Sequence, residues 1–410
     1  MSAAPAREVA IVSPWYPTPG QPFRGAFVEA MAAATAPGCD RATVYHSDGW
    51  PIPPGRGEAE LSAALRRLLP VAMRTRRTAG GADLVYAPAL IPRGSGHAEA
   101  ARRHAEGLRA ALAGEPLPQP VVHAHVGLPG GWAALRNARP DARVYVTEHA
   151  TFLDKVLAEP DARAMYDELL GRCARLLAVG EQVRAPLVDA FPHHADRIGL
   201  IANPVPFDAP RPAPVTDLRR WLYVGLLIPR KGVGQVLEAF AACHEDDPSL
   251  TLTVVGEGAL RDELADRAVD LKVADAVTFR GALPPEAAQR AMREHDLLVH
   301  ASRLETFGVT VVEAVAAGMP VLVTRCGGPE ETLAGVEQAA GELVEVQDGP
   351  DSLIAGYRRL RDRLADGSGG LDPARARAVL ADRYGYPAVA AAHHAIWFGA
   401  GSTGDPQVAP

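Results

Sequence analysis

The chain has 410 residues, of which 48% are hydrophobic and 22% are charged, and it carries a net charge of −7. This length suits two domains of ordinary size, and the composition excludes a disordered chain. The negative charge argues against nucleic acid as a partner. No apolar run reaches the roughly 18 residues of a membrane span, and the N-terminal segment lacks the apolar core of a signal peptide, so a cytoplasmic location is expected.

Lysine is rare in this chain. Only three of its 42 basic residues are lysines, namely Lys155, Lys231 and Lys272. A lysine kept in an arginine-rich chain is a candidate functional residue, because the two side chains are not interchangeable. The four cysteines lie far apart and form no C-x-x-C pair. Neither a disulfide framework nor a zinc site is therefore expected.

Short apolar runs alternate with alanine-rich helical stretches in the first half, which predicts a parallel sheet covered on both faces. The first strand is predicted over residues 8–13, followed by a helix from about 25 to 34. Further strands are predicted over 84–87, 121–124, 144–147, 176–179 and 198–202. The segment 203–217 contains clustered prolines and is expected to be a stiff, extended connector at a domain boundary.

A second alternating series follows this connector. Its strands are predicted over residues 221–224, 250–255, 277–279, 297–300, 320–324 and 341–344, with helices that include 234–244 and 261–271. The chain is therefore predicted to be an α/β protein with two doubly wound parallel-sheet domains. Ligands of such sheets bind at the carboxyl ends of the strands.

The segment 302–320, with the sequence SRLETFGVTVVEAVAAGMP, is the most informative part of the chain. A helix is expected to begin at Gly308, with Glu305 in the preceding loop and Glu313 near the second turn. The first backbone N–H groups of a helix are unpaired and favour an anion. Carboxylates on either side suit a ligand that also carries hydroxyls. Both features together indicate a nucleotide sugar, which has a diphosphate between two polyols.

These residues resemble a known family. The E-x7-E pattern followed by A-x-A-x-G-x-P-V is similar to the signature of the bacterial, retaining glycosyltransferases of family 4, which have the GT-B fold of two Rossmann-like domains facing across a cleft. Further segments agree in order and spacing, among them VVHAHVGLPGG, VTEHATF, IANPV, YVGLLIPRKGV, VVGEGALRDEL and TRCGGPEET. The resemblance covers essentially the whole chain.

The resemblance implies that residues of the second half bind the donor. Glu313 would hold the ribose hydroxyls, Glu305 the hydroxyls of the transferred sugar, and Lys231 the diphosphate. The other implied donor contacts are backbone N–H groups of Phe307, Gly308 and Val309, a base pocket with Gly256, Gly258 and Arg280, and Gly25 of the first helix.

One position departs from the family pattern. The family usually has a cation two residues after the end of the VG strand, and this chain has Leu226 there. Either Arg230 or Arg24 supplies the missing charge, or the donor is held less tightly.

Histidines follow two successive strands of the first half. The resemblance implies that His125 and His149 contact the donor sugar and the acceptor, with His149 assisting the acceptor hydroxyl and Asn203 as a further contact. The competing interpretation is that these are satisfied polar groups under a loop. His123 is expected to point away from His125 and to be structural.

The implied reaction moves a hexose or an N-acetylhexosamine from a nucleoside diphosphate sugar, UDP first and GDP second, to an acceptor hydroxyl. It would proceed by front-face displacement without a metal or a cofactor, with Lys231, Glu305 and His149 as catalytic residues. The acceptor stays open among a small molecule, a lipid-linked acceptor and a polysaccharide. The alternatives are a nucleotide-sugar hydrolase or epimerase, a pseudo-glycosyltransferase, and a non-catalytic partner subunit.

The expected domains are an acceptor-binding domain over 1–207 and a donor-binding domain over 208–384. The resemblance implies a helix over 385–400 that crosses back to the first domain, and 401–410 is expected to be a disordered tail. The sequence does not determine the oligomeric state. A basic run could contact an anionic membrane, although a solvated helix face is favoured; it comprises Arg66, Arg67, Arg74, Arg76 and Arg77.

Overall fold

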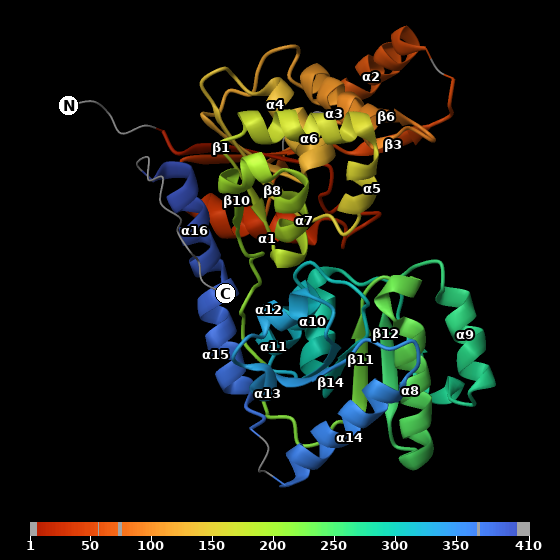
Figure 1. The fold of residues 1–410 in the computed structure, drawn as a ribbon. Helices are drawn as coiled ribbons and strands as arrows, with labels where there is room; N and C mark the ends of the chain where they lie inside the picture. Colours follow the sequence, from red (N-terminus) through yellow and green to blue (C-terminus); the bar gives the residue numbers. More distant parts are fainter. Residues whose placement is uncertain (1–5, 56, 73–75, 367–369, 400–410) are drawn as a thin grey trace. The chain divides into compact units, whose positions relative to one another are not determined.

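The structure is a computed structural model that describes residues 6–55, 57–72, 76–366 and 370–399. The expected tail over 401–410 and Arg74 of the basic run lie outside the described residues. The described chain forms two compact units (Figure 1). The first contains residues 6–19, 24–204 and 389–399, and the second contains 20–23 and 205–388.

The first unit is built on an eight-stranded sheet with the order β10-β9-β8-β7-β1-β2-β5-β4, parallel throughout except for the pair β4 and β5. Its strands are β1 (Glu8–Ser13), β2 (Arg41–His46), β4 (Arg76–Arg77), β5 (Asp83–Tyr86), β7 (Val121–His125), β8 (Arg143–Glu148), β9 (Arg175–Ala178) and β10 (Ile198–Leu200). A separate parallel pair joins β3 (Gly49–Ile52) to β6 (Ala89–Pro92).

Helices cover both faces of this sheet (Figure 1). They are α1 (Ala26–Thr35), α2 (Glu58–Ala72), α3 (His97–Ala111), α4 (Trp132–Asn137), α5 (Leu153–Ala158), α6 (Pro160–Arg172), α7 (Glu181–Ala190) and, from Val389 onward, α16 (Tyr386–Phe398). On one face, Ile11 of β1 and Val121 of β7 share a buried cluster with Met31 of α1 and Trp397 of α16. Because strands buried on both faces need apolar residues at every position, they read as continuous apolar runs.

The second unit contains a six-stranded, fully parallel sheet with the order β13-β12-β11-β14-β15-β16. Its strands are β11 (Arg220–Val224), β12 (Thr251–Val255), β13 (Val277–Phe279), β14 (Leu297–His300), β15 (Val321–Thr324) and β16 (Gly341–Val344). Its helices are α8 (Val233–Asp246), α9 (Arg261–Asp270), α10 (Pro285–Glu294), α11 (Val309–Ala316), α12 (Gly328–Thr332), α13 (Glu337–Ala340), α14 (Asp351–Asp366) and α15 (Pro373–Tyr384). Trp221 and Phe240 are fully buried in its core.

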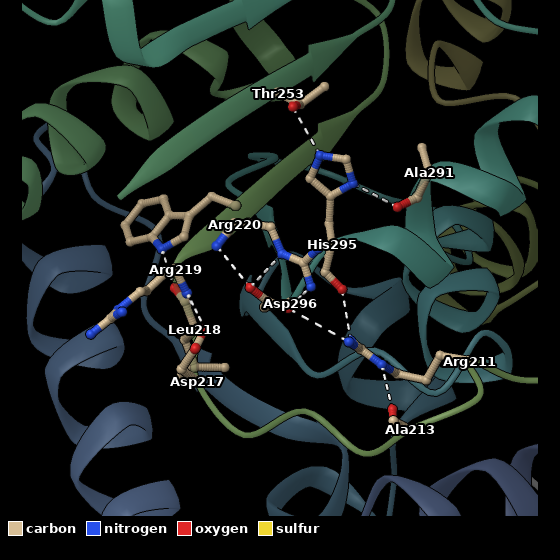
Figure 2. A network of polar contacts seen from close by, with 11 residues as sticks. Arg211, Ala213, Asp217, Leu218, Arg219, Arg220, Thr253, Ala291, His295 and Asp296 are labelled. Carbon is tan, nitrogen blue, oxygen red and sulfur yellow. Dashed lines mark hydrogen bonds and ion pairs between the residues drawn. The ribbon is translucent and has the colours of Figure 1, made fainter. Parts of the chain in front are cut away.

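A buried carboxylate fastens the proline-rich connector to the second unit (Figure 2). Asp296 precedes β14, is 4% exposed and accepts two hydrogen bonds from the guanidinium of Arg220, at 3.0 and 2.7 Å. Arg211 of the connector lies 3.6 Å from the same carboxylate and donates to the carbonyl of His295 at 2.8 Å. Burial raises the pKa of Asp296, but the hydrogen bonds and charge of Arg220 outweigh burial, so the pKa is lowered. The connector is therefore attached to this unit at Arg211.

The predicted fold class, with two Rossmann-like parallel sheets, is confirmed. β1, β13, β14 and β16 have the predicted bounds, and the other predicted strands differ by at most two residues at either end. The strands β2, β3, β4 and β6 were not predicted from the sequence. Among the described residues, no helix has both the length and the apolar character that a membrane crossing requires.

Candidate active site

Lys231 and Glu305 lie in loops that follow two adjacent central strands of the second sheet. β11 pairs with β12 on one side and with β14 on the other, so the strand order reverses between β11 and β14. The loop after β11 leads through a 3-10 turn at Pro229–Lys231, and the loop after β14 contains Glu305. In open α/β sheets, ligands bind beyond the carboxyl ends of the strands at such a reversal.

Glu305 is a buried carboxylate with two basic neighbours. The Nζ of Lys231 donates to its Oε1 at 2.5 Å, and the Nε2 of His300 lies 3.2 Å from the same oxygen. Burial raises the pKa of Glu305, but His300 and then Lys231 lower it well below the usual range. The carboxylate is therefore ionised and can accept hydrogen bonds from a ligand through its remaining lone pairs.

His300 was not a predicted site residue. It is the last residue of β14, 4% exposed, and its Nδ1 has no hydrogen-bond partner among the described residues. The signal in the sequence was a single polar residue closing the apolar run LLVH. A histidine at that point could equally have faced solvent, and only the structure shows its contact with Glu305.

Gly308 is the residue at which the chain turns into α11. Its φ of 82° is in the left-handed region, which favours glycine, and a Cβ there would lie 3.3 Å from the ring of Pro329. The N–H groups of Val309 and Thr310 open the helix and have no acceptor within it. Phe307 is buried and packs edge-on against Tyr384, with ring centroids 5.2 Å apart. Glu305 and this helix start are therefore held close together by buried contacts.

Glu313 sits in the second turn of α11, where burial raises its pKa from 4.5 to about 7. The folded protein then holds more protons than the unfolded chain between these two pH values, so stability falls as pH rises through that window. We expect Glu313→Gln to weaken this fall, on the order of 1 kcal/mol between pH 5.5 and pH 7.5. Urea midpoints at both pH values would measure it.

The control for this prediction is Glu263→Gln, at an exposed position on α9. It should leave the pH dependence of the urea midpoint unchanged. An equal pH dependence in wild type and in Glu313→Gln would show that Glu313 titrates normally.

Gly256 and Gly258 are required by the close approach of two loops of the second unit. A Cβ on Gly256, which has a φ of 142°, would lie 1.8 Å from the carbonyl oxygen of Gly225, and one on Gly258 would lie 2.3 Å from that of Leu227. The predicted base-pocket residue Arg280 follows β13 and is exposed. Packing within the second unit therefore requires glycine at both positions, whether or not a ligand binds there.

The two arginines considered as replacements for the cation missing at Leu226 both have protein partners. Leu226 itself is 42% exposed. Arg230 donates to the carbonyl oxygen of Leu304 at 2.6 Å, which ties the loop after β11 to the residue before Glu305. Arg24 lies 3.6 Å from the carboxylate of Asp48 in the first unit.

His125 and His149 lie together at the carboxyl edge of the first sheet. The Nδ1 of His125 and the Nε2 of His149 are 2.9 Å apart, and the Nε2 of His125 is buried without a partner among the described residues. Burial, followed by the nearby His123, lowers the pKa of His149 to about 3, so its ring is neutral at ordinary pH. The neutral ring can accept a hydrogen bond from a hydroxyl.

Glu148 fixes the backbone on both sides of this histidine pair. Its carboxylate accepts hydrogen bonds from the N–H of Gly127 at 2.7 Å and from those of His149 and Ala150, both at 2.8 Å, and from the hydroxyl of Tyr166. It is fully buried. Glu148 is therefore a structural residue that holds the loops after β7 and β8.

The prediction that His123 points away from His125 is wrong. Residues two apart in a strand share a face, and the two rings have centroids 5.4 Å apart. The expected structural role does agree with its contacts: the Nδ1 of His123 accepts from the Nε1 of Trp397 at 2.9 Å, and its Nε2 lies 2.7 Å from Thr147 Oγ1.

Gly25 and Asn203 complete the predicted residues. Gly25 has a φ of 75° and precedes α1, and a Cβ there would lie 2.5 Å from the backbone of Trp15. The backbone of the first unit therefore explains by itself why this position requires glycine. Asn203 is 6% exposed, close after β10. The ligand contacts expected of Gly25 and Asn203 stay predictions.

Three potential metal ligands converge elsewhere in the described part of the chain. The Nε2 atoms of His193 and His194 lie 2.7 and 3.3 Å from the Oδ1 of Asp167. Both histidines belong to a 3-10 turn directly before β10, at the amino edge of the first sheet. This surface group lies at the opposite edge from His125 and His149. The expectation of metal-free chemistry stays a prediction.

Comparison with known proteins identifies the family. Residues 59–209 match the family described as "Glycosyltransferase Family 4", and residues 207–362 match "Glycosyl transferases group 1". A D-inositol 3-phosphate glycosyltransferase of Frankia alni is 30% identical over 298 residues, or 65% of this chain and 73% of that protein. This chain belongs to glycosyltransferase family 4.

A second relative of this family 4 glycosyltransferase has a different name. A glycogen synthase of Mycobacterium tuberculosis is 30% identical over 261 residues, which is 59% of this chain and 62% of that protein. The chain therefore spans less than two thirds of that relative.

The family 4 glycosyltransferase also shares its fold with solved structures. Sucrose-phosphate synthase from Thermosynechococcus elongatus has a TM-score of 0.71 and 20% identity, covering 95% of this chain and 98% of that one. HepE of Anabaena, solved in complex with UDP-glucose, has a TM-score of 0.65 and 17% identity, covering 94% and 97%. These likenesses agree with the GT-B fold.

Proposed function

We propose that this family 4 glycosyltransferase moves a hexose or an N-acetylhexosamine from a nucleoside diphosphate sugar to an acceptor hydroxyl, with retention of configuration and without a metal. A UDP-sugar is the first candidate donor and a GDP-sugar the second. HepE, a neighbour in fold, has been solved with UDP-glucose, which makes UDP-sugars the donors to test first.

The observation that carries the proposal is the arrangement around Glu305. An ionised, buried carboxylate, an ammonium 2.5 Å from it and the start of α11 meet at the strand-order reversal of the second sheet. A nucleotide sugar needs these three functions together, because its sugar hydroxyls donate hydrogen bonds while its diphosphate requires positive potential.

Lys231 and the helix start would act on the leaving group. As the bond between the anomeric carbon and the phosphate oxygen breaks, negative charge grows on the diphosphate, and preorganised donors stabilise it. In front-face displacement the acceptor oxygen bonds to the same face of the anomeric carbon, and its proton passes to the departing phosphate oxygen. Glu305 would bind sugar hydroxyls and form no covalent intermediate, unlike the paired carboxylates of retaining glycosidases.

The remaining predicted residues have supporting roles in this proposal. Glu313 would hold the ribose, Arg280 and the two loop glycines the base, and Arg230 would add positive charge. Arg24, the other arginine considered for this charge, is paired with Asp48 and is not assigned to the donor. In the first unit, His125, His149 and Asn203 would contact the acceptor, and the neutral His149 ring would orient its hydroxyl.

A donor screen tests this proposal. We expect UDP-sugars to raise the unfolding temperature more than GDP- or dTDP-sugars at the same concentration, because the ligand that binds more tightly stabilises the folded state more. A ligand present at 100 times its dissociation constant stabilises it by about 2.7 kcal/mol. Release of nucleotide should then depend on an acceptor. Equal release with and without acceptors would favour the hydrolase alternative, and binding of a donor without turnover would favour a non-catalytic subunit. No response to any nucleotide sugar would contradict the proposal.

A further inference from the structure

A polar and aromatic cluster lies at the carboxyl edge of the first sheet, two strands from His125. β2 ends at His46, followed by Asp48 and Trp50, and β5 ends at Tyr86, which is in register with His46. Arg24, from the segment before α1, forms an ion pair with the carboxylate of Asp48. We call Arg24, His46, Asp48, Trp50 and Tyr86 the β2-edge cluster. All five residues belong to the first unit.

Trp50 is exposed but held in place. Its side chain is 41% exposed, which few large apolar side chains in the described part of the chain are. Its Nε1 donates to Asp48 Oδ2 at 3.0 Å and to the Tyr86 hydroxyl at 2.5 Å. The Tyr86 hydroxyl in turn donates to Asp48 Oδ2 at 2.6 Å. The polar edge of the indole is thus fixed by two partners, and its accessible surface is preorganised to pack against a ligand.

The ring of His46 has a buried nitrogen, Nε2, to which no described residue donates a hydrogen bond. Its Nε2 has no hydrogen-bond partner, although the side chain is only 3% exposed. The ring bonds to the backbone of Pro14, which has only a carbonyl to offer, so the Nδ1 carries the proton and the Nε2 carries a lone pair. Burial lowers the pKa of His46 to about 4, which keeps the ring neutral.

Asp48 Oδ1 faces the same space. It lies 3.9 Å from His46 Nε2 and 3.6 Å from the guanidinium of Arg24, both longer than a hydrogen bond. Two acceptors 3.9 Å apart cannot satisfy each other, and His46 Nε2 is a buried acceptor without a donor, which is costly. The geometry calls for a ligand with hydrogen-bond donors on neighbouring atoms.

We infer that the β2-edge cluster binds the acceptor as a carbohydrate ring, with neighbouring hydroxyls donating to His46 and Asp48 and one ring face packed on Trp50. This inference rests on the glycosyl transfer proposed above and names the substrate class that the transfer would use. Vicinal hydroxyls supply the two donors, and Arg24 can donate to a hydroxyl oxygen.

Other acceptor chemistries fit this cluster less well. An ionised phosphate has no hydrogen-bond donor, so it cannot satisfy His46 Nε2, and the charge of Arg24 is already paired with Asp48. A flat aromatic acceptor could stack on Trp50 but would bury His46 Nε2 and Asp48 Oδ1 without donors. A sugar ring with an apolar face and polar edges satisfies all three positions.

Binding of methyl glycosides to the full chain tests the inference without requiring turnover. Methyl glucosides, mannosides and galactosides, with their monodeoxy analogues, would be titrated by saturation-transfer NMR and calorimetry. We expect Asp48→Asn to weaken binding about ten- to a hundredfold, since it removes a charged acceptor, and Trp50→Ala to weaken it about two- to tenfold. The deoxy analogue that lacks the hydroxyl bound to Asp48 should lose binding in wild type but not further in Asp48→Asn. The analogue that lacks the neighbouring hydroxyl, which donates to His46, should lose binding in both proteins.

The matched controls are Asp189→Asn, exposed on α7, and Leu200→Ala, 37% exposed at the end of β10. Neither should change glycoside binding. Donor binding, measured separately with UDP-sugars, should be the same in Asp48→Asn and in wild type. This separates the acceptor site from the donor site.

Each outcome decides between the claims. Glycoside binding that is lost in Asp48→Asn while donor binding persists supports the inference. Donor binding together with binding of phenols or polyprenyl phosphates, but of no glycoside, overturns it and leaves the proposed transfer intact. Absence of binding by every nucleotide sugar overturns the proposed function and, with it, the assignment of this cluster to an acceptor.

Discussion

Replacing Lys231 with alanine is expected to slow glycosyl transfer at least about 100-fold. The Nζ of Lys231 is held 2.5 Å from Glu305 Oε1, and its side chain is only 17% exposed, so its charge is preorganised and little screened by solvent. If it stabilises the leaving diphosphate, the loss falls mainly on kcat, because the charge develops in the transition state. Steady-state kinetics with the best donor would measure it.

Among the described residues, the variant Lys231→Ala also leaves Glu305 with His300 as its one basic neighbour at hydrogen-bond distance. The pKa of Glu305 should then rise, because Lys231 is one of the groups that lower it. Lys231→Arg keeps the charge but not the shape of the ammonium and should restore part of the rate. A Lys231→Ala enzyme within twofold of wild type would contradict the proposed role.

The control for Lys231 is another lysine of the same unit. Lys272 is exposed and lies between α9 and β13, at the amino edge of the second sheet. Its φ of 59° is left-handed, so asparagine is a better replacement than alanine. Lys272→Asn should leave the rate unchanged.

Much of the fold could be predicted because both sheets are parallel, apart from the pair β4 and β5, and are covered on both faces. Strands such as β14 then appear as uninterrupted apolar runs with clear ends. The missed strand β2 has the sequence RATVYH, which begins with an exposed arginine and ends with a polar residue. The missed strands β3 (GWPI) and β6 (ALIP) each contain a proline, which argues against a strand, and β4 consists of two exposed arginines.

The site residues could be predicted only where they lie close together along the chain, because their spacing then indicates how they are arranged. Glu305 and Gly308 lie in one continuous segment, and their relation to α11 follows from sequence. The contacts of Glu305 with His300 and Lys231 do not, because β14 and the loop after β11 meet only through the strand order of the sheet. His46 and Asp48 were missed for the same reason, since their meaning depends on Tyr86 and Arg24 across neighbouring loops.

Replacing Trp397 with alanine is expected to destabilise the first unit by about 3–5 kcal/mol. Trp397 is fully buried near the end of α16 and belongs to the same cluster as Val9, Ile11 and Tyr145. Its indole N–H also satisfies His123 Nδ1 at 2.9 Å. Truncation would leave both a large cavity and a buried, unpaired imidazole nitrogen.

Trp397→Phe separates these two losses. It keeps most of the apolar volume but removes the hydrogen bond to His123, so its cost should lie between wild type and Trp397→Ala, at about 1–3 kcal/mol. Hydrogen exchange locates the effect within the chain. Amides of β1 and β7 should exchange faster in Trp397→Ala, while those of β11 and β14 should not, because Trp397 packs in the core of the first unit alone. Unchanged exchange in β7 would mean that α16 does not stabilise the first sheet, since helix and sheet would then unfold independently.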